Sequence, residues 1–149
     1  TGTAGTDEWF EISQVQLEEG SVATPFEQRP YGLELSLCQR YYETSYTNGS
    51  LIGTAVADNT NEVRGWGDGS GGISGAGARF QTTMRAQPTV VVYDRAGNAN
   101  KISTVNGGGT TTDNVNINVK RVGIDGISAR AYGGEVYETV FHYTADAEL

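Results

Sequence analysis

The sequence predicts a mainly β protein, an antiparallel β-sandwich of jelly-roll type with an N-terminal strand and one short α-helix. Twenty-one glycines and eight tyrosines, together with many threonines, asparagines and valines, favour short strands joined by tight turns. Several segments in the second half alternate apolar and polar residues, which is typical of strands with one buried face. A chain of 149 residues is long enough for one main domain with its own core.

The N-terminal part predicts a strand followed by an extended connector. Residues 9–17 alternate as a strand does, with a slip near Ser13 that a β-bulge would explain. Pro25 and Pro30 then exclude a long helix, because proline has no amide donor. The chain starts without Met, and we expect it to be a fragment of a longer polypeptide.

After Pro30 the apolar spacing becomes helical. Tyr31, Leu35, Cys38 and Tyr42 recur at three- and four-residue intervals, which predicts a helix over residues 31–42. Apolar residues surround much of this helix, so we expect it to be buried on more than one side. The β-domain, other copies of the chain, or both would cover it. Cys38, the one cysteine, is expected to act as a small hydrophobe and not as a reactive thiol.

The middle of the chain, residues 44–77, is rich in small polar residues and predicts short, irregular strands. Its apolar residues gather at 51–56 and 63–66. The many glycines of residues 65–77 predict a mobile or tightly folded loop, because glycine loses the most entropy on ordering. Long loops of this kind often carry function.

The second half contains clearer strand patterns. They predict strands over residues 78–84, 89–93, 101–105, 114–124, 127–132 and 135–143, with a flexible loop over 106–113. Turn signals at Asp125-Gly126 and Gly133-Gly134 predict that the last three strands form a meander. The expected organisation is a strand and connector over 1–29, a helix over 30–43 and a β-sandwich over 44–149.

Composition excludes several function classes. A net charge of −8 disfavours nucleic acid and anionic membranes as partners. The sequence contains neither an apolar run of membrane-spanning length nor a signal peptide. His142 is expected on a strand surface or an interface, so a catalytic triad is not expected. The oxygen-rich stretch Asp58, Asn59, Asn61 and Glu62 lacks EF-hand spacing and is assigned to turn chemistry. We therefore expect no enzyme activity, metal or cofactor.

Residues 15–42 read VQLEEGSVATPFEQRPYGLELSLCQRYY, and this segment resembles one common in tail fibres and related virion appendage proteins of tailed bacteriophages. FHYTADAEL, residues 141–149, looks like the usual ending of such proteins, and MRAQPTVVVYD, residues 84–94, is weakly similar to their terminal domains. The resemblance implies a receptor-binding tip domain at the distal end of a virion appendage. It also implies a homotrimer, whose helix contacts would involve Tyr31, Leu35, Cys38 and Tyr42. In the resembling proteins the VQLE strand closes a preceding domain that is similar to carbohydrate-binding modules.

The resemblance implies attachment to a bacterial surface polysaccharide or protein receptor. Sugar binding requires an aromatic platform with polar groups beside it, and Trp66 between two glycines is the best candidate. The candidate ligand-binding residues are Trp66, Arg64, Asp68, Asn59, Asn61 and Tyr132, with Tyr46 and Asn48 as weaker ones. In an equally supported alternative, Trp66 folds back and anchors its loop against the sandwich edge.

Two other functions stay open. The first is a purely structural domain that trimerises and terminates a fibre without binding a receptor. The second is a polysaccharide-degrading enzyme, which needs two facing carboxylates from among the 18 acidic residues. No catalytic segment of a fibre depolymerase is recognisable, so the enzyme ranks third.

Overall fold

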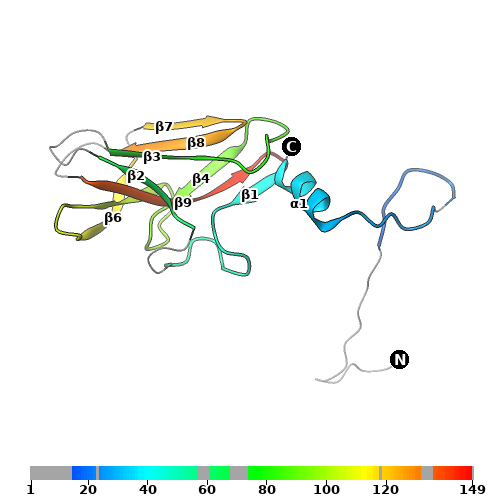
Figure 1. The fold of residues 1–149 in the computed structure, drawn as a ribbon, viewed down its shortest axis with the longest axis horizontal. Helices are drawn as coiled ribbons and strands as arrows, with labels where there is room; N and C mark the ends of the chain where they lie inside the picture. The colour runs from blue at the N-terminus through cyan, green and yellow to red at the C-terminus, as the bar shows by residue number, and fades with distance from the viewer. Residues whose placement is uncertain are drawn as a thin grey trace, which may run out of the picture.

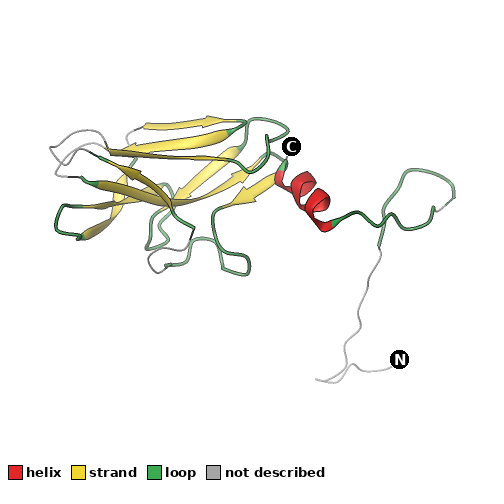
Figure 2. Ribbon diagram, viewed as in Figure 1, coloured by secondary structure: helices red, strands yellow, loops and turns green. Residues whose placement is uncertain are grey.

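The computed structural model describes residues 15–22, 24–56, 61–67, 74–117, 119–131 and 136–148. Within these ranges the chain forms one helix and nine strands, and the strands make two antiparallel sheets (Figure 1). The two sheets stack as a sandwich, and the helix lies outside it (Figure 2). The predicted fold class, a mainly β antiparallel sandwich with one short helix, is therefore confirmed.

The larger sheet is built around its longest strand, β9 (Glu138–Asp146). β1 and β4 both pair with the C-terminal half of β9, and β2 and β5 both pair with its N-terminal half. β6 extends the sheet beyond β5. β9 has strand partners on both edges, and all its residues except Asp146 are buried. The surrounding strands are β1 (Tyr42–Thr44), β2 (Val63–Trp66), β4 (Thr89–Tyr93), β5 (Lys101–Val105) and β6 (Thr111–Asn116).

The smaller sheet has three strands in the order β3-β8-β7. They are β3 (Ser74–Arg79), β7 (Val119–Gly123) and β8 (Gly126–Ala131). Gly123 faces Gly126 in the β7–β8 pair, so a two-residue turn joins these strands, which confirms the predicted hairpin at Asp125-Gly126. The inward positions of β8 carry Ile127, Ala129 and Ala131, all buried, and outward positions alternate with them.

The core lies between the two sheets, with larger side chains on one side and small ones on the other. Val92, Ile102 and Phe141 of the larger sheet are fully buried, and the smaller sheet meets them mainly with alanines. At one edge the strands β2 and β3 approach backbone to backbone. A Cβ atom added to Gly65 would lie only 1.9 Å from the carbonyl oxygen of Gly75. This close approach places the end of β2 directly beside β3.

Two predicted strands coincide with the observed ones, and several boundaries differ. β4 and β5 have the predicted bounds, and β2 occupies the apolar residues 63–66. The helix α1 (Tyr31–Gln39) ends three residues early, because Tyr42 pairs with Asp146 and starts β1. The predicted meander is wrong, since β9 returns to the larger sheet and does not follow β8 in the smaller one.

Other differences arise where the chain changes sheets or bends. Residues 114–124 form two strands, because β6 belongs to the larger sheet and β7 to the smaller one. β3 starts inside the predicted glycine loop and ends at Arg79, before the expected strand end at Met84. β6 begins inside the predicted loop 106–113. The described residues of the expected N-terminal strand, 15–17, are not in a strand, and residues 51–56 form none.

Candidate functional site

Helix α1 carries the predicted assembly residues, and the rest of the chain does not cover it. None of its residues is buried. Tyr31 is 78% exposed and Leu35 41% exposed, and Cys38 is exposed as well. Tyr42, in β1, is also exposed. The prediction that the helix is buried on more than one side is therefore wrong within a single chain, because the helix leaves the sandwich instead of packing on a sheet.

The base of the helix is fastened to the sandwich by three contacts. The amide of Arg85 donates to the carbonyl of Arg40 at 2.9 Å, and the amide of Ala147 donates to the carbonyl of Tyr41 at 2.7 Å. The Arg85 guanidinium also lies 5.0 Å from the centre of the Tyr41 ring, a cation–π geometry. The helix therefore has a fixed C-terminal end, while its N-terminal end projects away from the sheets (Figure 1).

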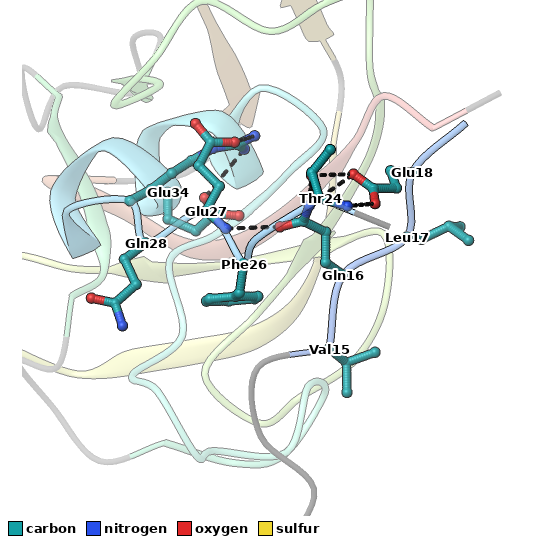
Figure 3. A pocket seen from close by; sticks show the side chains of 10 residues that line it. Val15, Gln16, Leu17, Glu18, Thr24, Phe26, Glu27, Gln28 and Glu34 are labelled. Atoms are coloured by element: carbon teal, nitrogen blue, oxygen red, sulfur yellow. Dashed lines mark hydrogen bonds and ion pairs between the residues drawn. The ribbon is translucent and has the colours of Figure 1, made fainter. Parts of the chain in front are cut away.

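The connector before the helix is closed by a hydrogen-bonded clasp (Figure 3). The Glu18 carboxylate accepts hydrogen bonds from the Thr24 amide and hydroxyl, and these bonds lower the pKa of Glu18. The Gln16 side chain donates to Glu18 at 3.1 Å and accepts from the amide of Glu27 at 2.9 Å. The four clasp residues lie between residues 16 and 27, so the clasp joins the two ends of the connector before the helix.

The clasp and the helix together display an apolar surface. Val15 and Leu17 extend away from the clasp (Figure 3) and are 73% and 101% exposed. Among the described residues, nine of the fourteen large exposed apolar side chains lie between residues 15 and 42. We call these nine the assembly surface: Val15, Leu17, Val22, Phe26, Tyr31, Leu33, Leu35, Tyr41 and Tyr42. So much apolar area in so few residues is typical of a protein–protein contact.

A second candidate site surrounds Trp66 at the end of β2. Val63 and Gly65 point inward, so Arg64 and Trp66 share the outer face. Trp66 is 77% exposed, so the alternative in which it folds back as an anchor against the sandwich edge is wrong.

Trp66 borders a groove of about 380 Å³ on the side of β3. The other walls are Gly75, Ala76, Gly77, Ser128 and Arg130. Arg130 and Ser128 were not among the predicted ligand residues. A sequence pattern could have identified them: Gly126, Ser128 and Arg130 alternate with the apolar residues of β8. This alternation places all three on the outer face of the strand.

Two further predicted residues lie in an adjoining groove of about 570 Å³, which also has Gly77 in its wall. Arg64 is held there by Glu62 at 2.8 Å and Glu138 at 3.0 Å. Asn61 also lines this groove, and its side chain donates to Thr47 at 3.4 Å. The structure thus brings Trp66, Arg64 and Asn61 into one region. The other candidates Asp68, Asn59 and Tyr132 lie outside the described residues.

The weaker candidate Tyr46 and the predicted surface histidine are both buried, so these two predictions are wrong. Asn48, the other weaker candidate, is exposed in a turn. The Tyr46 ring stacks on the His142 ring at 4.6 Å. His142 lies in β9 and is fully enclosed, because the residues that follow β1 cover this face of the sheet: Tyr46 stacks on its ring and Ser45 contacts its Nδ1.

Ser45 lies beside the buried histidine, in an arrangement that differs from a catalytic triad. His142 Nδ1 is 3.1 Å from Ser45 Oγ, and burial lowers the pKa of His142, so its ring is neutral at pH 7. Its Nε2 has no hydrogen-bond partner within the described residues. A triad needs a carboxylate there to orient the ring, and the pair instead joins Ser45 to the β9 backbone through the Tyr143 amide at 2.9 Å.

The buried carboxylates are engaged in internal bonds. Glu43 accepts from the Tyr143 hydroxyl at 2.6 Å and from the Gln81 amide at 2.8 Å. Glu62, from the oxygen-rich stretch, binds Arg64 and Arg95, each at 2.8 Å. Asp58 and Asn59 of that stretch lie outside the described ranges. In the part of the chain that the structure describes, no three His, Cys, Asp or Glu side chains gather as metal ligands would.

The assembly surface and Trp66 lie at opposite ends of β9. Tyr42 pairs with Asp146 at one end, and Trp66 pairs with Glu138 at the other. Eight residues of a strand separate these positions, a distance of roughly 26 Å. The described helix is too short to cross a membrane. Comparison with models of protein families, with curated proteins and with solved structures found no match.

Proposed function

We propose that this chain is a C-terminal tip domain of a phage tail fibre or related virion appendage, which assembles as a homotrimer and attaches to the bacterial surface. The observation that carries this proposal is the separation of an exposed apolar end from an exposed aromatic end along β9. The resemblance of residues 15–42 and 141–149 supplies the class of protein and the number of copies.

The assembly surface supports the trimer. A helix of nine residues with no buried side chain is marginal alone in water. Burying one large apolar side chain such as Leu35 contributes about 1.5–3 kcal/mol. Three parallel helices around one axis would bury Tyr31 and Leu35 from each copy. Because the base of each helix is fastened to its own sandwich, the end of the sandwich that carries Trp66 would then point in the same distal direction in all three copies.

The Trp66 end supports attachment to a sugar. The apolar face of a sugar ring packs on an exposed indole, and neighbouring polar groups hydrogen-bond its hydroxyls. Trp66 offers such a platform, with Arg130 and Ser128 in the wall of the same groove. Arg64 and Asn61 line the next groove. Because Glu62 and Glu138 hold the Arg64 side chain, its position is set before a ligand binds.

Light scattering behind a sizing column tests the trimer. We expect the mass of three 15.9 kDa chains for the wild type. Leu35→Asp places a charge in the helix contacts and is expected to give the mass of one chain. Leu51→Asp is the matched control, because Leu51 is 76% exposed but lies in a loop of the sandwich, and this variant should stay trimeric. A monomeric wild type, or a trimeric Leu35→Asp protein, would contradict the assembly role.

Binding to immobilised bacterial polysaccharides tests attachment. Trp66→Ala is expected to weaken binding by about thirtyfold or more, since a central tryptophan often contributes about 2 kcal/mol or more at an interface. Leu51→Ala removes an exposed apolar side chain elsewhere and should leave binding unchanged. Equal binding by wild type and Trp66→Ala would exclude Trp66 from the site.

The structural alternative uses the same assembly surface but gives Trp66 no ligand. Trimers that bind no polysaccharide and no bacterial cells would favour this terminating role over attachment. The enzymatic alternative predicts that the polysaccharide loses mass during incubation. A constant polysaccharide mass would rule it out.

A further inference from the structure

The outer face of the smaller sheet has an unusual composition. Directly opposed residues of antiparallel strands share a face, and the registers of β3, β7 and β8 therefore define the outer positions. These positions carry small residues, one valine and three arginines. We call this set the arginine face: Gly75, Gly77 and Arg79 of β3, Val119, Arg121 and Gly123 of β7, and Gly126, Ser128 and Arg130 of β8.

The three arginines of this face are available for a ligand. Among the described residues, the side chains of Arg79, Arg121 and Arg130 form no hydrogen bond or ion pair with the chain. By contrast, Arg64 and Arg95 are held by glutamates. Three unpaired guanidinium groups on one face are notable in a chain with a net charge of −8. They make this face attractive to anions although the whole molecule is acidic.

The floor between the arginines is nearly free of side chains. Four glycines, one serine and Val119 occupy the other outer positions, and beside the five small residues a ligand can lie close to the backbone. A Cβ atom on Gly75 would lie 2.7 Å from Cγ of Arg130. The stem of Arg130 therefore lies across Gly75, in the wall of the groove that Trp66 borders. Asp125, in the turn at the end of this face, accepts a hydrogen bond from the Thr83 hydroxyl at 2.8 Å.

The spacing of the arginines indicates the size of the ligand. Arg79 pairs with Gly126, four residues before Arg130 on the neighbouring strand, so their Cα atoms are roughly 14 Å apart. Arg121 of β7 pairs with Ser128 of β8, and Ser128 lies midway between Gly126 and Arg130 along β8. A single small anion is too short to contact all three arginines, whereas a polymer with recurring negative charges is long enough to contact each of them.

We propose that the arginine face, continuous with the Trp66 groove, binds an anionic polysaccharide with carboxylate or phosphate groups recurring along its chain. This inference rests on the proposed attachment function and names the chemical class of its ligand. Guanidinium groups bind carboxylate and phosphate in a bidentate manner. Trp66 packs against a sugar ring, and Arg130 binds the acidic group beside that ring. Arg79 and Arg121 bind further acidic groups along the glycine-lined part of the arginine face.

The test measures binding of the assembled protein to four immobilised polymers by biolayer interferometry. They are alginate with carboxylates, teichoic acid with phosphates, neutral dextran, and duplex DNA as a polyanion without the sugar platform. The wild type is expected to bind alginate or teichoic acid, more weakly as salt rises, and the preferred polymer identifies the acidic group. Dextran and DNA should bind at least tenfold more weakly.

Arginine variants locate the site. Arg121→Gln should weaken binding about tenfold, since a charge-assisted hydrogen bond contributes 1.5–3 kcal/mol, and Arg121→Lys should restore part of the loss. Lys101→Gln makes the same charge change on β5 of the other sheet and should stay within about twofold of the wild type. The triple change of Arg79, Arg121 and Arg130 to Gln should abolish binding. Arg121 is exposed, so the single variant carries the test if the triple variant does not fold.

Three results would overturn the inference. The first is an equal loss of polysaccharide affinity in Lys101→Gln and Arg121→Gln, which would mean that the net charge of the protein alone determines binding. The second is DNA binding as tight as glycan binding. The third is binding of dextran that the triple variant leaves unchanged, which would refute the arginine face while the attachment function stands. Binding of none of these polysaccharides and of no bacterial cells would refute both.

Discussion

Gly65 gives the sharpest test of how the two sheets meet. In Gly65→Ala the new Cβ atom would lie 1.9 Å from the Gly75 carbonyl oxygen and 2.5 Å from Cα of Ala76. Both obstacles are backbone atoms, so no side-chain rotation relieves the clash and β2 must move away from β3. Overpacking a well-packed core typically costs 1–3 kcal/mol, and the rigid neighbours here place the expected loss of unfolding free energy at about 3 kcal/mol or more.

Urea denaturation followed by circular dichroism measures this loss. For a domain of about 100 residues each kcal/mol lowers Tm by roughly 4–8 °C, so a Tm lowered by at least about 12 °C is expected. Gly77→Ala is the matched control in β3, because its Cβ would lie 3.2 Å from the nearest atom and the expected cost is under about 1 kcal/mol. An unfolding free energy for Gly65→Ala within about 0.5 kcal/mol of the wild type would refute the close approach of the sheets.

Two further predictions concern buried polar groups. Tyr143→Phe removes the hydroxyl that donates to Glu43 at 2.6 Å, and we expect a loss of about 2 kcal/mol in urea denaturation. The control Tyr42→Phe, at an exposed tyrosine, should leave the unfolding free energy nearly unchanged. Equal losses of unfolding free energy in the two variants would contradict a stabilising role for the Tyr143–Glu43 hydrogen bond. Burial lowers the pKa of His142 below its ordinary 6.5, so unfolding takes up a proton and stability falls as pH drops below about 6.5, by up to 1.4 kcal/mol per unit. His142→Gln should flatten this pH dependence between about pH 7 and 5.5, and identical profiles would exclude His142 as its cause.

Local patterns were sufficient to predict some strands, because the signal lies within each segment. Residues 89–93 are nearly all β-branched, and β4 has the predicted bounds. No such local pattern marks the division of residues 114–124 between β6 and β7. Val115 and Ile117 continue one alternation into β7, and a strand period of two is the same in either sheet. Which sheet a strand joins depends on contacts distant in sequence.

The site shows the same division between local and distant information. The glycines on either side of Trp66 left an open indole and a folded-back anchor equally supported, and its exposure of 77% agrees with the open one. The arginine face required the pairing of three strands, and no local pattern joins Arg79 to Arg121. The burial of His142 was equally invisible, since it depends on Ser45 and Tyr46, which are distant in sequence and cover its ring. Prediction failed mainly where a residue's environment is set by strand registers.

The geometry of β9 also explains how shallow grooves can serve attachment in the proposed trimer. The grooves beside Trp66 and Arg64 are open, and a single copy would hold a polysaccharide weakly. Three copies joined at the helix end would present three Trp66 ends roughly 26 Å from that end, all toward one surface. Once one groove holds a polymer, the others meet it at a high effective concentration, which raises the overall affinity by orders of magnitude without a new contact. In the proposed function, assembly through Leu35 and binding through Trp66 therefore depend on each other, even though the helix and Trp66 lie at opposite ends of β9.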